Sequence, residues 1–377
     1  MFELKDKNLY YIGGIVRDEI LGKECFDTDL TYIGHAIDYC KKKYPEYCIK
    51  INEDFGTVRL KINDKEIDIA STRDEVYDKK GHLPRVYNIG CDLKKDVLRR
   101  DFTINALAKS TLTGEIVDYT NGLKDIEDKI LRVLHDNSFI DDPTRIVRGL
   151  KFAVRFGFEL DKHTKKLQED YLNNINYDMS YKRLKKELIE TFDLNKQECY
   201  DRFTGQKIYK LIGKSKVNPP VCNIEDLINN YPVKTKWIVY IGWHDDIENL
   251  PLTKEEQKII NDYRELLGVG VNIGVNAGVN VKEDDYSIYK TCLRKSKEAI
   301  LLYTIKTGSN NLLRYFDIEN IKPEITGNDL KKAGITPSKK YSECFDYILK
   351  KKLENSAISK EDELVSAMEF FKRNGLC

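Results

Sequence analysis

The pattern of hydrophobic residues changes near residue 125, and this change constrains the fold more than any other feature of the chain. Before it, short runs of β-branched and aromatic residues alternate with turns, as in NLYYIGG, GTVRLKI, KEIDIAS and GEIVDYT. Runs of this kind predict the strands of a small mixed sheet. We expect helices over 15–22, 33–44 and 101–110 to pack on that sheet.

From about residue 126 the strand signals fade and helical spacing replaces them. Ile146, Leu150 and Ala153 recur at intervals that place them on one helical face, and Ser180 before Tyr181 is typical of a helix N-cap. The predicted fold class is therefore α+β, with a small mixed sheet in the first third and only helices afterwards.

A chain of 377 residues is too long for one compact core. We place domain boundaries to give an α+β part over 1–125, a helical part over 126–195 and a second helical part over 196–377. The segments KVNPPVC and NNYPVK interrupt the helical pattern. The Gly-, Val- and Asn-rich segment 268–280 is interpreted as a loop between helices, with no chemistry assigned to it.

Composition excludes several classes of protein. No apolar run approaches the roughly 18 residues that span a bilayer, and the N-terminus lacks the apolar core of a signal peptide, so we expect a cytoplasmic protein with no membrane partner. None of the nine cysteines forms a C-x-x-C pair, and the five histidines lack zinc-ligand spacing beside them. The net charge of +1 is neutral evidence on nucleic acid, because a local basic face is enough to contact phosphates.

The first segment whose residues could bind a ligand or take part in catalysis is 13–34. Gly13 and Gly14 stand between a predicted strand and a predicted helix, where glycine allows close backbone approach and the helix N-terminus offers N–H groups to a phosphate. Arg17 follows in the first helical turn and could add a guanidinium to a triphosphate. A simple tight turn would explain the glycines equally well.

Asp27 and Asp29 stand ten residues further along. Side chains at i and i+2 of a strand point to the same side, so these two carboxylates lie together and repel each other unless a cation bridges them. Oxygen ligands of this kind suit Mg²⁺, and two such ions would serve an in-line phosphoryl displacement. Asp68, in a later strand, could join them or activate a 3′-hydroxyl. A solvated edge strand is the alternative.

Two further segments are polar where burial is expected. Arg99, Arg100, Asp101 and Asn105 lie in the otherwise apolar segment 97–108, and unpaired burial of such groups is costly. They form an internal network or contact the phosphate and ribose of a nucleotide, and both interpretations stay open.

Asp142, Arg145 and Arg148 recur at a spacing of three, which places them on one helical face. A carboxylate beside a guanidinium can pair with the amino group and ring nitrogen that cytosine and adenine share. An ordinary ion pair is the alternative.

In this order the segments resemble the class II tRNA nucleotidyltransferases and the closely related bacterial poly(A) polymerases. A weaker match lies at 323–343, and the main matching stretches are 13–29, 66–73, 99–106, 118–132, 141–158 and 180–187.

The resemblance implies a polymerase-β-like nucleotidyltransferase head over 1–125, a neck over 126–195, and a body and tail over 196–377. It implies that Asp27 and Asp29 bind Mg²⁺, with Asp68 as a further catalytic residue. Asp142 and Arg145 would read the base in place of a template. The implied nucleotide-binding set is Gly14, Arg17, Arg100, Asp101, Asn105, Asp142, Arg145, Arg148 and Lys151.

Two positions depart from the family pattern, and one segment bears on specificity. Asp141 replaces the usual glutamate, and Lys151 replaces an arginine, so it keeps the charge but loses bidentate geometry. The segment 72–87 corresponds to the flexible loop that helps such enzymes switch from C to A.

The function that the resemblance implies is addition of the 3′-terminal CCA to tRNA from CTP and ATP, with the helical half contacting the acceptor and T-arm half of the tRNA. Single-nucleotide A or CC addition and poly(A) synthesis remain alternatives within the family. An RNA-binding protein with an inactive head is a different class, disfavoured because Asp27, Asp29 and Asp68 are all present. Lys182, Arg183, Lys185 and Lys186 are candidate tRNA contacts. The oligomeric state, monomer or homodimer, stays open.

Overall fold

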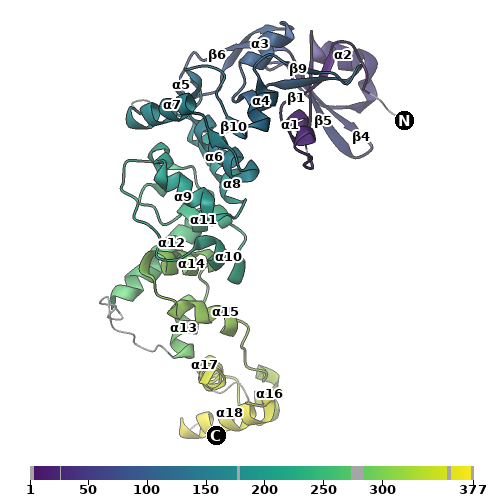
Figure 1. Cartoon of the computed structure of the whole chain (residues 1–377). Coiled ribbons are helices and arrows are strands. Elements are labelled where there is room, and N and C mark those ends of the chain that lie inside the picture. Colours follow the sequence, from purple (N-terminus) through teal and green to yellow (C-terminus); the bar gives the residue numbers. More distant parts are fainter. Residues whose placement is uncertain (1–3, 26, 176–178, 273–283, 355–357, 375–377) are drawn as a thin grey trace. The chain divides into compact units, whose positions relative to one another are not determined.

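The computed structural model describes residues 4–25, 27–175, 179–272, 284–354 and 358–374 (Figure 1). The chain forms two compact units. Unit 1 comprises Met1–Val217 and Glu248–Pro251, and unit 2 comprises Asn218–Ile247 and Leu252–Cys377. The division after Val217 falls inside KVNPPVC, where the sequence interrupts its helical pattern. The boundaries at residues 125 and 195 stay predictions.

A seven-stranded mixed sheet is the base of unit 1, which confirms the predicted α+β class. Its strand order is β3-β4-β5-β2-β1-β8-β9, with β2 and β5 parallel and the other neighbouring strands antiparallel. The strands are β1 (Leu9–Ile12), β2 (Thr28–Tyr32), β3 (Cys48–Asn52), β4 (Thr57–Ile62), β5 (Lys65–Ser71), β8 (Leu107–Ser110) and β9 (Ile116–Asp118).

Helices cover the apolar parts of this sheet. The helix α2 (Ala36–Lys43) buries Ile37 and Cys40 in one core cluster with Leu30, Leu60 and Ile69 of the strands. Further along the sheet, α3 (Leu93–Leu98) contributes to a second cluster with residues of β1 and β8. Alternation along β2, β4 and β5 leaves their polar side chains on the other face of the sheet.

The remainder of unit 1 is helical apart from two small strand pairs. Ile146, Leu150 and Ala153 of α6 are buried, as their helical spacing predicts, and Gly157 ends that helix with a φ of 70°. The strand pairs are β6 (Arg73–Val76) with β7 (Arg85–Ile89), and β10 (Ile130–Leu131) with β11 (Glu159–Leu160). The helices and turns are α1 (Gly14–Ile20), η1 (Pro45–Tyr47), η2 (Thr103–Asn105), α4 (Gly122–Glu127), α5 (Ser138–Asp141), α6 (Thr144–Phe156), α7 (Lys162–Asn173), α8 (Tyr181–Phe192), α9 (Gln197–Gly205) and η3 (Ile208–Leu211).

The regular secondary structure in the described residues of unit 2 consists of helices only. Reciprocal capping boxes begin α16 at Thr326 and α18 at Ser359. Of the helices described in the two units, none is both long enough and apolar enough to cross a membrane. The remaining elements of the chain are α10 (Ile224–Asn230), α11 (Lys236–Ile241), η4 (Ile247–Asn249), α12 (Lys254–Asn272), α13 (Asp285–Cys292), α14 (Lys297–Thr307), η5 (Asn311–Arg314), α15 (Tyr315–Ile318), α16 (Gly327–Lys332), α17 (Lys340–Glu354) and α18 (Lys360–Arg373).

Three local expectations are wrong. The predicted helix 101–110 is instead the turn η2 followed by β8, whose position between β1 and β9 buries it on both faces and removes the alternation that marks a strand. The short pair β10–β11 adds strands beyond residue 126. In the segment 268–280, residues up to Asn272 belong to α12, and 273–280 lie outside the described residues.

Ser180 does occupy the N-cap position of α8, but its side chain makes no capping hydrogen bond. Its backbone N–H donates to the carbonyl of Gly81 instead, at 3.0 Å. This position therefore anchors a neighbouring loop.

Candidate active site

The turn between β1 and α1 brings the backbone close to an arginine. Gly13 has a φ of 74°, in the left-handed region that favours glycine. A Cβ at this position would lie 3.0 Å from Nη1 of Arg100 and 3.4 Å from the carbonyl oxygen of Asn105. Gly13 therefore permits both the sharp turn into Gly14 and the close passage of Arg100.

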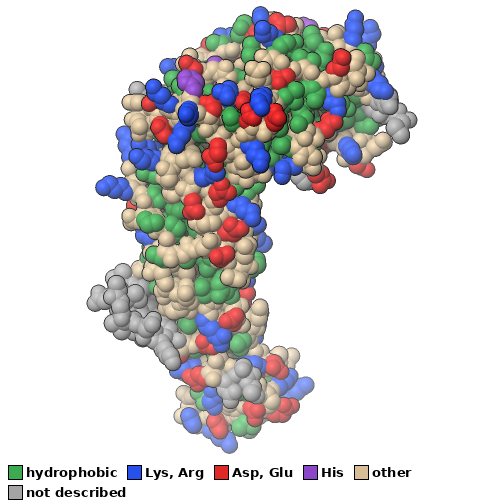
Figure 2. Space-filling model, viewed as in Figure 1, with side chains coloured by type: hydrophobic (Ala, Val, Ile, Leu, Met, Phe, Trp, Pro, Cys, Tyr) green, Lys and Arg blue, Asp and Glu red, His purple; other side chains and the backbone are tan. Residues whose placement is uncertain are grey.

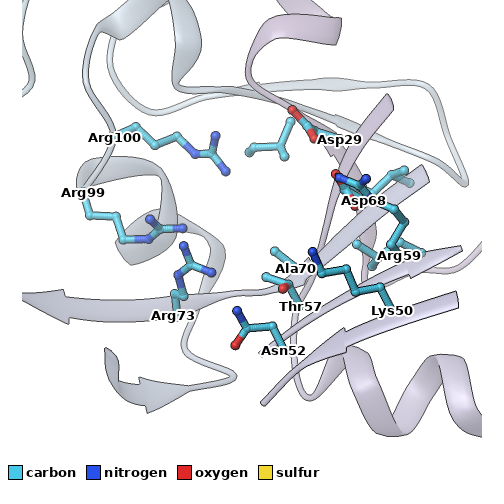
Figure 3. A pocket seen from close by; sticks show the side chains of 13 residues that line it. Asp29, Lys50, Asn52, Thr57, Arg59, Asp68, Ala70, Arg73, Arg99 and Arg100 are labelled. Atoms are coloured by element: carbon cyan, nitrogen blue, oxygen red, sulfur yellow. Dashed lines mark hydrogen bonds and ion pairs between the residues drawn. The ribbon is translucent and has the colours of Figure 1, made fainter. Parts of the chain in front are cut away.

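The three predicted catalytic carboxylates lie on two adjacent strands. Asp27 immediately precedes β2, Asp29 lies within it, and Asp68 of β5 is the direct parallel partner of Asp29. Arg59 donates to both carboxylate oxygens of Asp68, at 2.7 and 2.8 Å (Figure 3). Asp68 is thus held by a guanidinium, whereas Asp27 and Asp29 have exposed side chains beside a cavity.

The environment of Asp29 suits a cation. Although the Asp29 side chain is exposed on the cavity side, the protein around it partly desolvates its carboxyl and raises the pKa, and the negative charge of Asp68 raises that pKa further. Among the described residues, no group of three or more His, Cys, Asp or Glu side chains gathers in a metal-binding arrangement. The donor set fits an ion that takes two carboxylates from the protein and its other oxygen ligands from water and substrate phosphates, as Mg²⁺ does.

A buried hydrogen-bonded network links α1 to α6 through the segment 97–108. Arg17 donates to Asp18 at 2.8 Å and to the side-chain oxygen of Asn105. Asn105 donates to Asp101 at 3.0 Å, and Arg148 donates to the other oxygen of Asp101 at 2.8 Å. The internal network, one of the two alternatives that the sequence left open, is therefore present.

Burial and charge shift the pKa values inside this network. Burial lowers the pKa of Arg17. Burial would raise the pKa of Asp101, but the positive charge of Arg148, the hydrogen bond from Asn105 and the charge of Arg145 hold that pKa well below its usual value. Asp101 is consequently an anion at neutral pH that compensates the buried cations around it.

The positive charge of Lys151, the position where the family has arginine, is also balanced by acidic side chains. Its Nζ donates to Glu187 at 3.0 Å and to Glu190 at 2.5 Å, both on α8. Arg148 shares Glu187, at 3.3 Å. Lys151 lines the same cavity as Asp27 and Asp29, and its nucleotide-binding role stays a prediction.

Arg100 is less fully paired with acidic groups than Arg148 and Lys151 are. Its Nη2 donates to Asp96 at a long 3.3 Å, while Arg99 makes shorter contacts with Asp96 and Glu75. The Nε of Arg100 is buried and finds no hydrogen-bond partner among the described residues. An unsatisfied buried donor costs roughly 1–3 kcal/mol, which a bound anion would remove.

The predicted base-reading pair lies at the start of α6, but its members are held by other residues. Asp142 precedes the helix and accepts from Thr144 Oγ1 at 2.6 Å and from Arg183 of α8. Arg145 donates to Ser138 Oγ at 2.7 Å and, through Nη2, to the hydroxyl of Tyr77 at 3.3 Å.

The segment 72–87 forms the hairpin β6–β7 and docks on the same residues. Besides the Tyr77 contact, the N–H of Gly81 donates to the carbonyl of Asp141 at 3.0 Å. Arg183 donates to the carbonyl of His82 at 3.3 Å. Arg183 therefore connects the hairpin to Asp142.

One cavity of about 940 Å³ brings together all the predicted site residues except Asp68. Asp68 lines a neighbouring cavity, which Asp29 and Arg100 also border. The predicted residues in the larger cavity are Gly14, Arg17, Asp27, Asp29, Arg100, Asp101, Asn105, Asp142, Arg145, Arg148 and Lys151.

Sequence reasoning missed the role of Arg183 and Tyr77. Arg183 was a candidate RNA contact, yet its guanidinium pairs with Asp142 inside unit 1; its position three residues after Ser180, in a family-like segment, was the available signal. Lys185 is likewise buried and donates to the carbonyl of Pro251 at 2.9 Å. Lys182 and Lys186 are exposed.

Comparison with known proteins identifies a matching head domain and several similar chains. Residues 9–132 match the poly A polymerase head domain. The chain is 43% identical over 169 residues to the A-adding tRNA nucleotidyltransferase of Aquifex aeolicus, a match over 44% of this chain and 20% of that protein. It is 29% identical to the A-adding tRNA nucleotidyltransferase of Geobacter sulfurreducens, over 94% of this chain and 44% of that protein. The chain thus spans less than half the length of these two relatives.

Another relative is matched over most of its length. The A-adding tRNA nucleotidyltransferase of Halalkalibacterium halodurans is 27% identical over 97% of this chain and 89% of that protein. Among solved structures, a CCA-adding enzyme in an apo form superposes with a TM-score of 0.77, at 24% identity, covering 96% of this chain and 91% of that one. This likeness confirms the fold, a polymerase-β-like head followed by helices. The first third of the chain is thus similar to the poly A polymerase head domain, and most of the chain is similar to A-adding tRNA nucleotidyltransferases.

Proposed function

We propose that this protein adds nucleotides to the 3′ end of tRNA without a template. The observation that carries the proposal is the single cavity in which Asp27 and Asp29 lie together with Arg100 and the pair Asp142 and Arg145. Carboxylates that suit Mg²⁺, a cation with an unpaired donor, and a carboxylate–guanidinium pair that can read a base edge are the parts that nucleotidyl transfer requires.

In the reaction, the 3′-oxygen of the RNA attacks the α-phosphorus of the nucleoside triphosphate. The bond between the α-phosphorus and its bridging oxygen breaks, and the electron pair leaves with pyrophosphate. Asp27 and Asp29 would hold Mg²⁺, which neutralises charge on the transferring phosphate. Asp68 is the group adjacent to Asp29 that could take the hydroxyl proton, with Arg59 fixing its orientation.

Recognition of the base falls to Asp142 and Arg145. Asp142 can accept from the exocyclic amino group of cytosine or adenine, and Arg145 can donate to the adjacent ring nitrogen. On their Watson–Crick edges, uracil and guanine lack this combination of an amino group beside an unprotonated ring nitrogen. Arg183 already donates to Asp142, and Arg145 already donates to Tyr77. A bound base must therefore replace or rearrange these contacts.

Two specificities are consistent with this site. Full CCA addition from CTP and ATP accords with the complete hairpin β6–β7 over the segment that the family uses to switch from C to A. Addition of the terminal A alone is favoured by the three relatives described above, all of them A-adding enzymes.

The test supplies the protein with three tRNA substrates, ending before the CCA, after the first C and after CC, and with each nucleoside triphosphate separately. CCA addition predicts C incorporation on the first two and A on the third. An A-adding enzyme extends only the tRNA ending in CC. Long A tracts would indicate a poly(A) polymerase, and no extension of any substrate would contradict the proposal.

A further inference from the structure

A row of four charged residues crosses the sheet on the face opposite to α2. Lys50 of β3 is the register partner of Arg59 on β4, Arg59 is the partner of Asp68 on β5, and Asp68 is the partner of Asp29 on β2. Register partners on adjacent strands place their side chains on the same face of a sheet. Two cations therefore extend outward, in line, from two carboxylates of the candidate active site.

This row forms one wall of a second cavity, of about 400 Å³. Figure 3 shows Lys50, Asp68 and Asp29 facing Arg73, Arg99 and Arg100 across it. The neighbouring row supplies neutral hydrogen-bonding groups, Asn52 and its register partner Thr57. The volume lies in the range of small-ligand pockets, roughly 300–1,000 Å³, and matches the lower part of that range, as one nucleotide would require.

The second cavity meets the nucleotide cavity at the carboxylates. Asp29, Arg73, Arg99 and Arg100 line both, whereas Lys50, Asn52 and Arg59 line only the smaller one and Gly14, Asp142 and Arg145 only the larger. A two-substrate transfer needs this arrangement, because the attacking oxygen must approach the phosphorus from the side opposite to the leaving group.

One lysine in the smaller cavity has no partner in the described part of the chain, and one arginine there has a single unsatisfied donor. Lys50 is exposed and makes no ion pair or hydrogen bond with other described residues. The buried Nε of Arg100 has no hydrogen-bond partner among the described residues either. By contrast, Arg59 is held by Asp68 and Glu66. Because Arg100 borders both cavities, it is Lys50 that indicates an anion in the smaller one.

We propose that this second cavity binds the 3′-terminal nucleotide of the RNA that is extended, with Lys50 contacting its backbone phosphate and its hydroxyl directed toward Asp29 and Asp68. The proposal rests on the proposed function, because it names the subsite for the second substrate. A second nucleoside triphosphate fits less well, since the glycine turn and the base-reading pair both belong to the other cavity.

The position of Lys50 fits a phosphate upstream of the reacting hydroxyl. Adjacent strands lie about 4.8 Å apart, so Lys50 stands three strand spacings, roughly 14 Å, from Asp29 along the row. Lys50 is therefore a positioning residue for the RNA and takes no part in binding the triphosphate.

The test compares Lys50→Ala with Lys42→Ala in the full-length protein. Lys42 is an exposed lysine of α2, on the opposite face of the sheet, so the control removes the same charge from the same part of the chain. Steady-state extension is measured with the tRNA ending that the wild type extends, varying tRNA and triphosphate separately. We expect Lys50→Ala to raise KM for tRNA several-fold with KM for the triphosphate unchanged, Lys50→Arg to restore it, and Lys42→Ala to match the wild type.

Direct binding supplies a readout that does not require activity. Affinity for a short single-stranded RNA is measured by fluorescence anisotropy at several salt concentrations without triphosphate. Loss of one phosphate contact should weaken binding and reduce the slope of log affinity against log salt by about 0.7. If no substrate is extended but Lys50→Ala still weakens RNA binding in this way, the proposed function fails while the anion-binding row stands.

The subsite assignment itself is overturned if Lys50→Ala leaves both KM for tRNA and RNA affinity at their wild-type values. It is also overturned if KM for the triphosphate rises by the same factor as KM for tRNA, because Lys50 would then serve the other cavity or the fold as a whole. An equal loss in Lys42→Ala would assign the effect to net charge.

Discussion

At the scale of single residues, the site depends on side chains that are already paired with one another. Asp142 and Arg145 do not form the i, i+3 ion pair that their spacing allows; Arg183 holds the first, and Ser138 and Tyr77 hold the second. Held in this way, the acceptor and the donor have defined directions before any ligand arrives, which the proposed reading of a base edge would require.

Asp142→Ala should lose the preference for CTP and ATP over UTP and GTP. Arg183→Gln should shift selectivity in the same direction, because it releases Asp142, and the double variant should resemble Asp142→Ala alone rather than combine both losses. The measurement is kcat/KM for each of the four triphosphates. Unchanged selectivity in Asp142→Ala would remove this carboxylate from base recognition, and additive effects would separate Arg183 from it.

Asp101 predicts a specific dependence on pH. Its folded-state pKa lies below the unfolded value of 3.8, so the stabilisation is present above about pH 4 and is lost as the pH falls through the lower folded-state pKa. Asp101→Asn should lower the free energy of local opening of α6 at pH 7 by about 3 kcal/mol, because Arg148 loses a buried charged partner. Below pH 4 the difference between the two proteins should shrink progressively, and it should vanish only when the pH falls below the folded-state pKa of Asp101.

Hydrogen exchange of the α6 amides, followed by mass spectrometry, measures this effect locally. The exposed Asp54→Asn is the matched control and should exchange like the wild type at every pH. A protection difference that is as large at pH 3 as at pH 7 would contradict the ionic role of Asp101.

At the scale of elements, the hairpin β6–β7 and the turn between β1 and α1 set the geometry around these residues. The hairpin contributes Tyr77 to Arg145 and the His82 carbonyl to Arg183. Tyr77→Phe deletes one hydroxyl and should alter the selectivity between CTP and ATP with a stability cost of only about 1 kcal/mol. Tyr87→Phe, in the same hairpin but 61% exposed, should leave selectivity unchanged. Identical kinetics for the two variants would show that the docking of the hairpin does not act on Arg145.

The turn at Gly13 offers a comparison with Gly22. Both have positive φ, 74° and 62°, but a Cβ at Gly22 would meet nothing within 4 Å, whereas at Gly13 it would press on Arg100. Gly22→Ala should show only the backbone strain, about 1–3 kcal/mol in thermal or urea unfolding. Gly13→Ala should show a similar strain and, in addition, raise KM for the triphosphate by displacing Arg100. Equal KM values in the two variants would exclude Arg100 from triphosphate binding.

At the scale of the whole molecule, the sequence predicted the composition of the site better than its internal contacts. The mixed sheet, the strands that carry Asp29 and Asp68, and the helix that carries Arg145 follow from local periodicity and turn residues. The pairing of Arg183 with Asp142 does not, since these residues are 41 positions apart and meet only when α8 packs on α6. The helix expected over 101–110 failed for a related reason, because burial of β8 on both faces depends on its neighbours in the sheet.

The arrangement of charges on the molecule was likewise not predictable from composition. The chain has a net charge of +1, and on the face seen in Figure 2 the Lys and Arg side chains are interspersed with Asp and Glu. Composition therefore gives no signal for RNA. The signal lies in the register of β3, β4, β5 and β2, which aligns Lys50 and Arg59 with two carboxylates.

The most direct test of nucleotidyl transfer at this site is incorporation of labelled ATP, with Mg²⁺, into tRNA ending in CC by the wild type and by Asp29→Ala. Asp29 is exposed and lies on the cavity, so its replacement should leave the fold and tRNA binding intact. We predict addition of one A by the wild type and no detectable addition by Asp29→Ala, with equal tRNA affinity. Undiminished incorporation by Asp29→Ala, or no incorporation by the wild type with any nucleotide, would contradict this account.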